Sequence, residues 1–389
     1  MKPFSAAARA RHQKDLLEVT AIPTATGCED RVVAWVERWA RRRDLTIDLD
    51  VWGNLMLRRT GVRRTPNPLV LAAHLDHPAF VVTAVDGPAE EGGAAGRCTV
   101  EAEFRGGVGD AYFEGAKVRL WRAGPRNTAG VPGRVAALRP ADPAVPGSFK
   151  TATLAFARPP KASPGDFATW DLGGSVVRGG TLHAPVCDNL AGLAAGLAAF
   201  GALLKQDGAG NVRGRDVRLL CTRAEEVGFV GAVGAVKSGL LPAGARVVVL
   251  ENSKASDHAP QGAGPVVRVG DATSTFDPEL TAAVARAARS VSSVDPDFRW
   301  QRKLMTGGTC EASAYAVFGL AATCVCLPLG NYHNMDLAKG RVAREFIALD
   351  DLHGMVRLLA ALAGGAGADG PSLAERLEGI FAQRSRVLA

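Results

Sequence analysis

Residues 69–76 read Leu-Val-Leu-Ala-Ala-His-Leu-Asp, five apolar residues followed at once by an imidazole and, two positions later, by a carboxylate. An apolar run this short and unbroken is typical of a strand that is buried on both faces of a sheet. In an open α/β sheet, ligands bind beyond the carboxyl ends of such strands, and His74 and Asp76 stand at that end. The stretch therefore predicts a central strand that leads directly into a functional site.

Strand-like and helical patterns alternate on both sides of this run. Residues 29–43 have the periodicity of an amphipathic helix, and residues 189–204 are apolar nearly all round, which indicates a buried helix. Further strands are expected at residues 45–51, 55–58, 217–221, 246–250 and 322–327, and further helices at residues 227–237, 278–291, 309–318 and 350–363. This alternation predicts an α/β fold in which helices flank a mixed central sheet.

The composition and the periodicity of the sequence change between about Ala79 and Gly180. Glycine and proline become frequent, helical periodicity disappears, and short alternating segments such as residues 98–104, 117–121 and 151–157 take its place. That pattern predicts a small, all-β, barrel-like insertion. We therefore expect a catalytic α/β domain over residues 1–78 and 181–363, interrupted by a β domain over residues 79–180.

The last residues, 364–389, differ again from the rest. Residues 364–367, Gly-Gly-Ala-Gly, suggest a flexible hinge, and Leu373, Leu377 and Phe381 then fall on one face of a C-terminal helix. The sequence leaves open whether this helix packs on its own domain or on a neighbouring subunit.

Composition narrows the class of protein. Of the 389 residues, 47% are hydrophobic and 22% charged, and no apolar stretch approaches the roughly 20 residues of a membrane span. Residues 1–22 lack the apolar core of a signal peptide, so a cytoplasmic location is expected. The seven cysteines are scattered and form no Cys-x-x-Cys pair, which favours reduced thiols over a disulfide scaffold or a thiolate zinc site.

The formal net charge of +7 raises the question of an acidic partner. The positive residues are spread along the chain, and the densest run, residues 41–43, stands at the end of a predicted helix. Basic residues at a helix C-terminus are favoured by the helix dipole and are usually solvated. Neither a nucleic-acid partner nor a membrane partner is therefore expected.

Residues able to bind metals or transfer protons recur near the ends of the predicted strands. Besides His74 and Asp76, they are Asp188, which opens a helix, the adjacent pair Glu225 and Glu226, Glu251, and His333. Carboxylates and imidazoles grouped in this way can form a two-metal hydrolytic site. In His74-x-Asp76 the carboxylate can accept the second imidazole N–H and orient the ring. Of two adjacent glutamates, one can bind a metal while the other takes a proton from a water.

Each of these segments also fits a simpler role. His74 and Asp76 can merely cap the backbone at a strand end, and Glu225 and Glu226 can be exposed acids that begin a helix. His333, within Gly-Asn-Tyr-His-Asn-Met (residues 330–335), can be an ordinary turn histidine. No segment alone decides between the two roles, whereas their combination favours a metal site.

That combination resembles one family, the tetrahedral-type dinuclear metallo-aminopeptidases, which include glutamyl and deblocking aminopeptidases. The resemblance extends over about residues 10–363. Residues 222–228, Thr-Arg-Ala-Glu-Glu-Val-Gly, resemble the Glu-Glu-Val-Gly signature of that family, and residues 187–192, Cys-Asp-Asn-Leu-Ala-Gly, resemble its Asp-Asp-Arg-Ala-Gly motif. Residues 305–309, Met-Thr-Gly-Gly-Thr, resemble its Ser-Gly-Gly-Thr-Asp segment, and residues 164–166, Pro-Gly-Asp, a turn before the Asp188 motif. The long interval between His74 and Asp188 leaves room for the β domain that this family inserts there.

The resemblance implies a zinc-peptidase-like catalytic domain with two divalent metal ions per subunit. Asp188 would bridge them about 4 Å apart. His74 and Glu251 would complete one metal site, and Glu226 and His333 the other. Glu225 would be the general base, with Asp76 behind His74. Zinc is the first expectation, although cobalt and manganese also suit such mixed nitrogen and oxygen ligands.

The implied activity is an aminopeptidase acting on short peptides. In such relatives the β domain helps to build hollow particles, so the resemblance implies a homo-oligomer, of which a dodecamer is one form. Other dinuclear amidohydrolases, such as deacylases or carboxypeptidases, remain open, as does a catalytically silent assembly or binding homologue. The sequence also departs from the pattern of the family, with His77-Pro78 in place of Glu-Ile, Cys310-Glu311 in place of Asp-Ala, and Glu251 where relatives often have Asp.

Overall fold

The computed structural model describes residues 2–85, 98–126, 128–206, 215–366, 371 and 373–388. Within these ranges, eight strands form one mixed sheet in the order β1-β2-β12-β3-β13-β16-β14-β15. Their bounds are β1 (Leu45–Leu49), β2 (Leu55–Arg59), β3 (Leu69–His74), β12 (Val217–Thr222), β13 (Arg246–Lys254), β14 (Val266–Gly270), β15 (Gln301–Leu304) and β16 (Ala321–Leu329). The four central strands, β12, β3, β13 and β16, run parallel, so their carboxyl ends lie at one edge.

The central strands are buried on both faces, as the run at residues 69–73 predicts. In β3, Leu71 and Ala73 pack in one hydrophobic core, and Val70 and Ala72 in the other, because successive side chains of a strand point to opposite faces. The first core includes residues of α1 (Ala6–Val19), α2 (Asp30–Arg41), α3 (Leu190–Gln206), α5 (Pro278–Val294) and α7 (Leu349–Ala363). The second includes residues of α4 (Val230–Lys237) and α6 (Glu311–Val317). The predicted mixed α/β class is confirmed.

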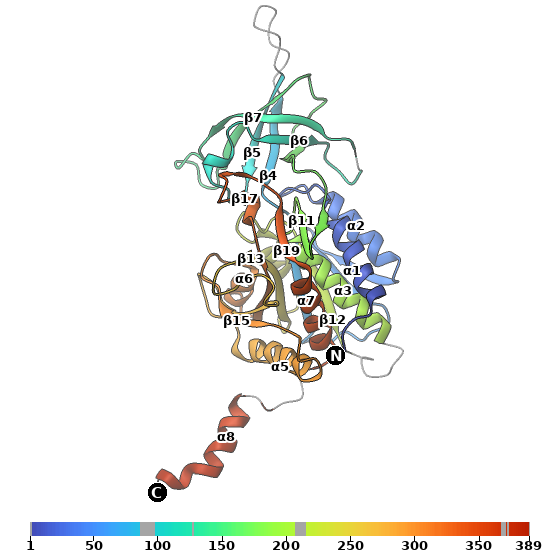
Figure 1. Cartoon of the computed structure of the whole chain (residues 1–389), viewed down its shortest axis with the longest axis vertical. Coiled ribbons are helices and arrows are strands. Elements are labelled where there is room, and N and C mark those ends of the chain that lie inside the picture. The colour runs from blue at the N-terminus through green and yellow to red at the C-terminus, as the bar shows by residue number, and fades with distance from the viewer. Residues whose placement is uncertain are drawn as a thin grey trace, which may run out of the picture.

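A closed antiparallel barrel lies beyond the sheet, at the top of Figure 1, in the order β4-β5-β8-β7-β6-β9. Its strands are β4 (Ala79–Val85), β5 (Cys98–Arg105), β6 (Lys117–Trp121), β7 (Val131–Arg139), β8 (Lys150–Phe156) and β9 (Phe167–Trp170). Phe80, Phe104, Phe113 and Trp170 fill it with edge-on ring contacts, the Phe104 and Phe113 centroids being 4.7 Å apart. The predicted barrel-like β fold is therefore confirmed.

The barrel ends at Trp170, before position 180. The next strand, β10 (Val176–Arg178), pairs with β11 (Thr181–Ala184), and β11 pairs with β19 (Glu345–Ala348). This small sheet leads into α7. Residues 176–178 therefore pair with segments that flank the central sheet and not with strands of the barrel. The short elements nearby are η1 (Asp110–Tyr112), η3 (Tyr332–Asn334), β17 (Met335–Asp336) and β18 (Arg341–Val342).

The glycine run after α7 begins as a helix cap. The N–H of Gly365 donates to the carbonyl of Leu362, and that of Ala366 to the carbonyl of Ala361. Gly365 has a φ of +100°, a left-handed conformation that glycine adopts without strain. Residues 364–366 therefore close the end of α7 with hydrogen bonds. Gly367 lies outside the described residues, and the flexible hinge over residues 364–367 stays a prediction.

The C-terminal helix α8 (Leu373–Arg384), followed by η4 (Ser385–Leu388), extends away from the rest of the chain (Figure 1). Leu377 and Phe381 are 56% and 61% exposed. These two side chains therefore do not pack on their own domain, which was one of the two alternatives left open by the sequence; the side chain of Leu373 lies outside the described residues.

Two features of composition have structural counterparts. All seven cysteines are buried and unpaired. In the described ranges, no helix is both long enough and apolar enough to cross a membrane.

Candidate metal centre

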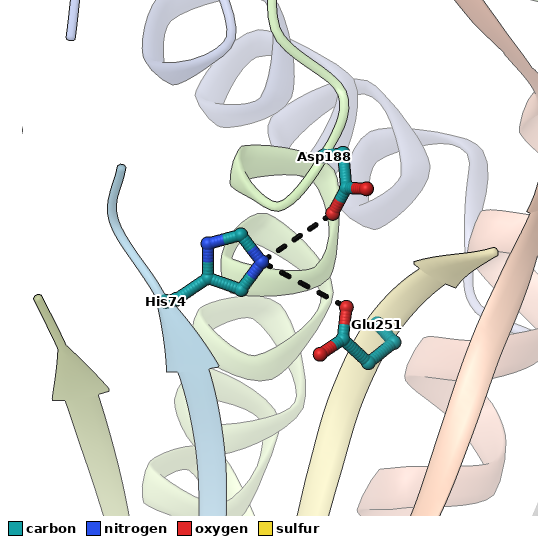
Figure 2. Close-up of side chains that lie close together, drawn as sticks. All are labelled: His74, Asp188 and Glu251. Carbon is teal, nitrogen blue, oxygen red and sulfur yellow. Dashed lines mark ion pairs between the residues drawn. The ribbon is translucent and has the colours of Figure 1, made fainter. Parts of the chain in front are cut away.

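His74, Asp188 and Glu251 approach one another at the carboxyl edge of the parallel strands (Figure 2). His74 is the last residue of β3, Asp188 stands just before α3, and Glu251 comes from β13. The Nε2 atom of His74 lies 3.4 Å from Oδ1 of Asp188 and 3.8 Å from Oε2 of Glu251. One ligand atom from each residue lies within 4.8 Å of the others, a group that can hold a metal ion.

Glu251 and His74 were expected beyond the ends of their strands, and that detail is wrong. β13 continues through Glu251 to Lys254 because its parallel partner β16 pairs with it as far as Leu329. His74 is still paired with Thr222 of β12. The carboxyl edge of the sheet therefore extends further than the apolar runs alone indicate.

A second group consists of Asp188, Glu226 and His333. The Nε2 atom of His333 lies 3.3 Å from Oε2 of Glu226 and 3.9 Å from Oδ2 of Asp188. Asp188 thus points one carboxylate oxygen at His74 and the other at His333. A single carboxylate is shared by two three-residue groups.

Asp76 fixes the turn that carries the adjacent glutamates. It accepts hydrogen bonds from the backbone N–H groups of Glu225, at 2.9 Å, and Glu226, at 3.1 Å, and from the Thr26 hydroxyl, at 2.8 Å. Its Oδ1 also lies 3.5 Å from Nδ1 of His74. One buried carboxylate therefore positions both glutamates and faces the ring of His74.

Glu225 lies beside both groups. Its Oε2 is 3.9 Å from Nε2 of His74, and with His74 and Glu226 it forms a third group of possible ligands. The side chain retains 11% exposure, against 6% or less for those of His74, Asp188, Glu226, Glu251 and His333. Glu225 is thus the acid of this cluster with the most access to solvent.

The barrel also contributes to the arrangement. The Nδ1 atom of His333 lies 2.6 Å from the carbonyl oxygen of Gly107, which follows β5. A carbonyl accepts only, so Nδ1 carries the proton and Nε2 is left as the ligand atom. The sequence did not indicate this contact, because the two residues are far apart in the chain.

Burial and mutual proximity shift the pKa values of these groups. Burial, with the nearby charges of Glu251 and Glu226, raises the pKa of Asp188 to about 7, against the opposing effect of His74. Burial also raises the pKa of Glu225 well above its usual range, and Glu226 adds to that shift. Burial disfavours the His333 cation, but Glu226 and Asp188 outweigh it and raise its pKa to about 9. Carboxylates crowded in this way are stabilised by positive charge placed among them.

The residues present fit divalent cations. Asp188 Oδ1, Glu226 Oε1 and Glu251 Oε1 are buried atoms without a hydrogen-bond partner, although buried polar atoms are normally paired. Their oxygens and the imidazole Nε2 atoms form the mixed ligand set that zinc and similar metals prefer. The seven candidate residues named from the sequence all lie in this one region.

A glycine holds the glutamate turn close to the sheet. A Cβ atom at Gly231, in α4, would lie 2.0 Å from the carbonyl oxygen of Arg223. The helix begins only at Val230, because the N–H groups of Gly228 and Phe229 first close a turn onto the carbonyl of Glu225. The absence of a side chain at Gly231 therefore lets α4 lie close to the segment that carries Glu225.

Replacing Gly231 with alanine is expected to lower the free energy of unfolding by about 1–3 kcal/mol, because the methyl group must displace the backbone that carries Glu225. Chemical denaturation measures this change. Gly174→Ala is the control, since nothing lies within 4 Å of a Cβ there. Equal stability of the two variants would show that the packing at Gly231 is not tight.

Three residues near the cluster were not assigned a role from the sequence. Glu345 accepts backbone hydrogen bonds from the segments of Asp188 and His333. His77, noted only as a departure from the family pattern, contacts the carbonyl of Asp188. Glu311 is fully buried, and burial raises its pKa to about 8. The departures from the family pattern at His77 and at Cys310-Glu311 were the available signals, whereas Glu345 binds only backbone N–H groups and had none.

Part of the chain matches a known family by sequence. The model of the M42 glutamyl aminopeptidase family matches residues 157–349, the segment that contains Asp188, Glu225, Glu226, Glu251 and His333. Among curated protein sequences there is no significant match.

Several solved structures share the fold. The TET1 peptidase of Pyrococcus horikoshii, described as assembling into a tetrahedron or a large octahedral shell, is 20% identical over 90% of this chain and 99% of that chain, with a TM-score of 0.70. Aminopeptidase APDkam598 from the archaeon Desulfurococcus kamchatkensis is 20% identical over 91% of this chain and 94% of that chain, with a TM-score of 0.69. A TET aminopeptidase from a marine sediment Thaumarchaeota archaeon is 18% identical over 91% and 97%, with a TM-score of 0.71.

At these identities the structural likeness establishes the fold, and the family model adds the sequence match. The resemblance found in residues 187–192 and 222–228 is thereby confirmed. Residues 157–349 of this chain therefore match the M42 glutamyl aminopeptidase family by sequence, and the chain shares its fold with the TET aminopeptidases.

Proposed function

We propose that this protein is a metal-dependent aminopeptidase that removes N-terminal residues from short peptides. The observation that carries the proposal is the position of Asp188, which points one oxygen at His74 and the other at His333. The match to a glutamyl aminopeptidase family supports the reaction class.

Two divalent cations are proposed, with zinc as the first choice and cobalt or manganese as alternatives. His74 and Glu251 would hold one cation, Glu226 and His333 the other, and Asp188 would bridge them. When bound, such a pair supplies Lewis acidity, which polarises a scissile carbonyl and lowers the pKa of a water. The buried, unpaired oxygens of Asp188, Glu226 and Glu251 support these assignments.

Glu225 is proposed as the general base. Its carboxylate is close to both groups and is the most exposed of the cluster, so it can take a proton from a water and later give it to the leaving amine. Asp76 would serve as its positioning partner, since it holds the N–H of Glu225 and faces His74.

The space beside the cluster suits a small substrate. A cavity of about 640 Å³ lies between the barrel and the body of the chain, with His77, Asn334 and Pro185 in its wall. This volume is in the range of small-molecule sites. The wall of the cavity touches the proposed centre through His77, whose Nδ1 lies 2.6 Å from the carbonyl oxygen of Asp188, while the proposed ligands and Glu225 are not among its lining residues.

A homo-oligomer is proposed as the working form, with a dodecamer as the first assembly to test. Among the structures that share the fold, one is described as a dodecamer and another as a tetrahedron or octahedral shell. The exposed apolar side chains of α8, such as Leu377 and Phe381, are available for contacts between subunits.

The substrate class is tested with matched peptides. An aminopeptidase must bind a free α-amine, so a short peptide with a free N-terminus is expected to be cleaved at least about 100-fold faster than its N-acetylated form; about 3 kcal/mol of lost recognition corresponds to this factor. Chromatographic detection of the released N-terminal residue measures both rates, with a chelator-treated sample as the control. Cleavage of the acetylated peptide alone would identify a deacylase-like amidohydrolase, and release of the C-terminal residue a carboxypeptidase.

A further inference from the structure

Glu345 connects the two halves of the candidate metal centre through hydrogen bonds alone. One carboxylate oxygen, Oε2, accepts the backbone N–H groups of Cys187, at 2.7 Å, and Asp188, at 2.9 Å. The other, Oε1, accepts the N–H of His333 at 2.9 Å. The side chain is fully buried, so all three bonds are shielded from water.

The position of Glu345 in the fold explains how it reaches both segments. It is the first residue of β19 and pairs with Ala184 of β11, the strand that leads to Asp188. The next residue, Phe346, exchanges backbone hydrogen bonds with Gly330, at the start of the loop that carries His333. β19 therefore lies between the two ligand-bearing segments.

His77 joins the same two segments on the other side of Asp188. Its Nδ1 lies 2.6 Å from the carbonyl oxygen of Asp188, and its Nε2 lies 2.9 Å from Oδ1 of Asn334. Asn334 in turn donates to the carbonyl of Pro185 at 2.9 Å. The backbone of Asp188 is thus held through its N–H by Glu345 and through its carbonyl by His77.

We propose that Glu345 is a positioning residue that sets the separation between Asp188 and His333, and hence the affinity of the site that these two form with Glu226. The inference rests on the proposed metal centre. Glu345 is not itself a ligand, because both of its oxygens are engaged by backbone N–H groups. It acts by keeping two loops, far apart in sequence, in one arrangement.

Glu345→Gln separates this role from a general contribution to packing. The carboxamide has the shape of the carboxylate but only one acceptor oxygen, so it cannot satisfy both segments. Its oxygen can still accept hydrogen bonds from the N–H groups of Cys187 and Asp188. Its NH₂ group then faces the N–H of His333, and these two donors cannot bond to each other. The loss is therefore expected at the site of Glu226 and His333, while the site of His74 and Glu251 is spared.

The measurement is calorimetric titration of chelator-treated protein with Co²⁺. Wild type is expected to bind two equivalents per chain, and E345Q to bind one of them about 10–100-fold more weakly. Asp351→Asn is the matched control. Asp351 is another buried carboxylate whose two oxygens accept backbone N–H groups, from Gly262 and Gly264, but it holds no ligand segment. D351N is expected to lose stability and to keep both affinities.

The outcomes separate this inference from the proposed function. If wild type binds no Co²⁺, the metal centre itself is wrong. If wild type binds two equivalents and a folded E345Q matches it at both, Glu345 has no positioning role. Should E345Q fail to fold, hydrogen exchange of the wild type decides: the amides of Cys187, Asp188 and His333 should be strongly protected, and rapid exchange at any of them contradicts the proposal.

Discussion

Replacing Glu225 with glutamine is expected to lower kcat by about 10²–10⁴-fold while both metal ions stay bound. The carboxamide keeps the size of the side chain but cannot accept a proton from water, so the effect isolates the proposed general base. The backbone N–H of Glu225 still donates to Asp76, which keeps the turn in place. Steady-state kinetics on a free short peptide, with metal content measured on the same sample, test this result.

The neighbouring residue provides the control, because Glu225 also belongs to a group of possible ligands with His74 and Glu226. Glu226→Gln removes a proposed ligand, so this variant should lose one metal ion, whereas E225Q should not. If E225Q loses metal and E226Q retains it, the roles of the two glutamates are exchanged. Unchanged turnover in a metal-loaded E225Q would falsify the assignment of Glu225 as the base.

The ligands that can be predicted from the sequence are those that stand at the carboxyl ends of buried strands. The apolar run at residues 69–73 indicates a strand buried on both faces, and the ligands of an open α/β sheet gather at the carboxyl ends of such strands. His74 and Glu251 follow from that rule, even though Glu251 lies inside β13. Period and composition likewise indicate the barrel, because short segments that alternate between apolar and polar residues, bounded by glycine and proline, are typical of antiparallel strands.

The contacts that hold the ligands are not predictable in this way. Glu345 binds backbone N–H groups, which every residue except proline has, so no side-chain pattern marks its partners at positions 187, 188 and 333. The contact of His333 with Gly107 depends on how the barrel is positioned relative to the loop of His333, which is a property of the tertiary structure. The closure of the barrel is likewise not predictable, because alternation of apolar and polar residues identifies strands but not which of them pair.

The burial of Glu311 is also not predictable from the local sequence. It begins α6 and reads as an ordinary acid at a helix N-terminus, which the helix dipole favours. In the fold it is fully buried, and neither of its carboxylate oxygens has a hydrogen-bond partner among the described residues. Burial of this kind depends on the packing of α6 against β13 and β16, which the local sequence does not contain.

The second large effect is expected at Asp188, since it is the one side chain that belongs both to the group of His74 and Glu251 and to the group of Glu226 and His333. Asp188→Asn should reduce the metal content from the proposed two ions per chain to nearly none and lower activity by at least about 10³-fold, because a neutral amide would replace the charge that is proposed to bridge the two cations. Glu251→Gln and His333→Gln should each lose one ion only. Metal analysis after gel filtration measures all three variants.

A buried aspartate outside the centre provides the control for D188N. Asp166 accepts the N–H groups of Ala123 and Ser163, so Asp166→Asn disturbs a buried carboxylate without touching a proposed ligand and should retain both ions. Retention of two ions by D188N, or loss of both in H333Q alone, would contradict the bridging role. A shared ligand must affect both sites, whereas a terminal ligand affects only its own, and this difference in stoichiometry distinguishes a bridge from two adjacent but separate sites.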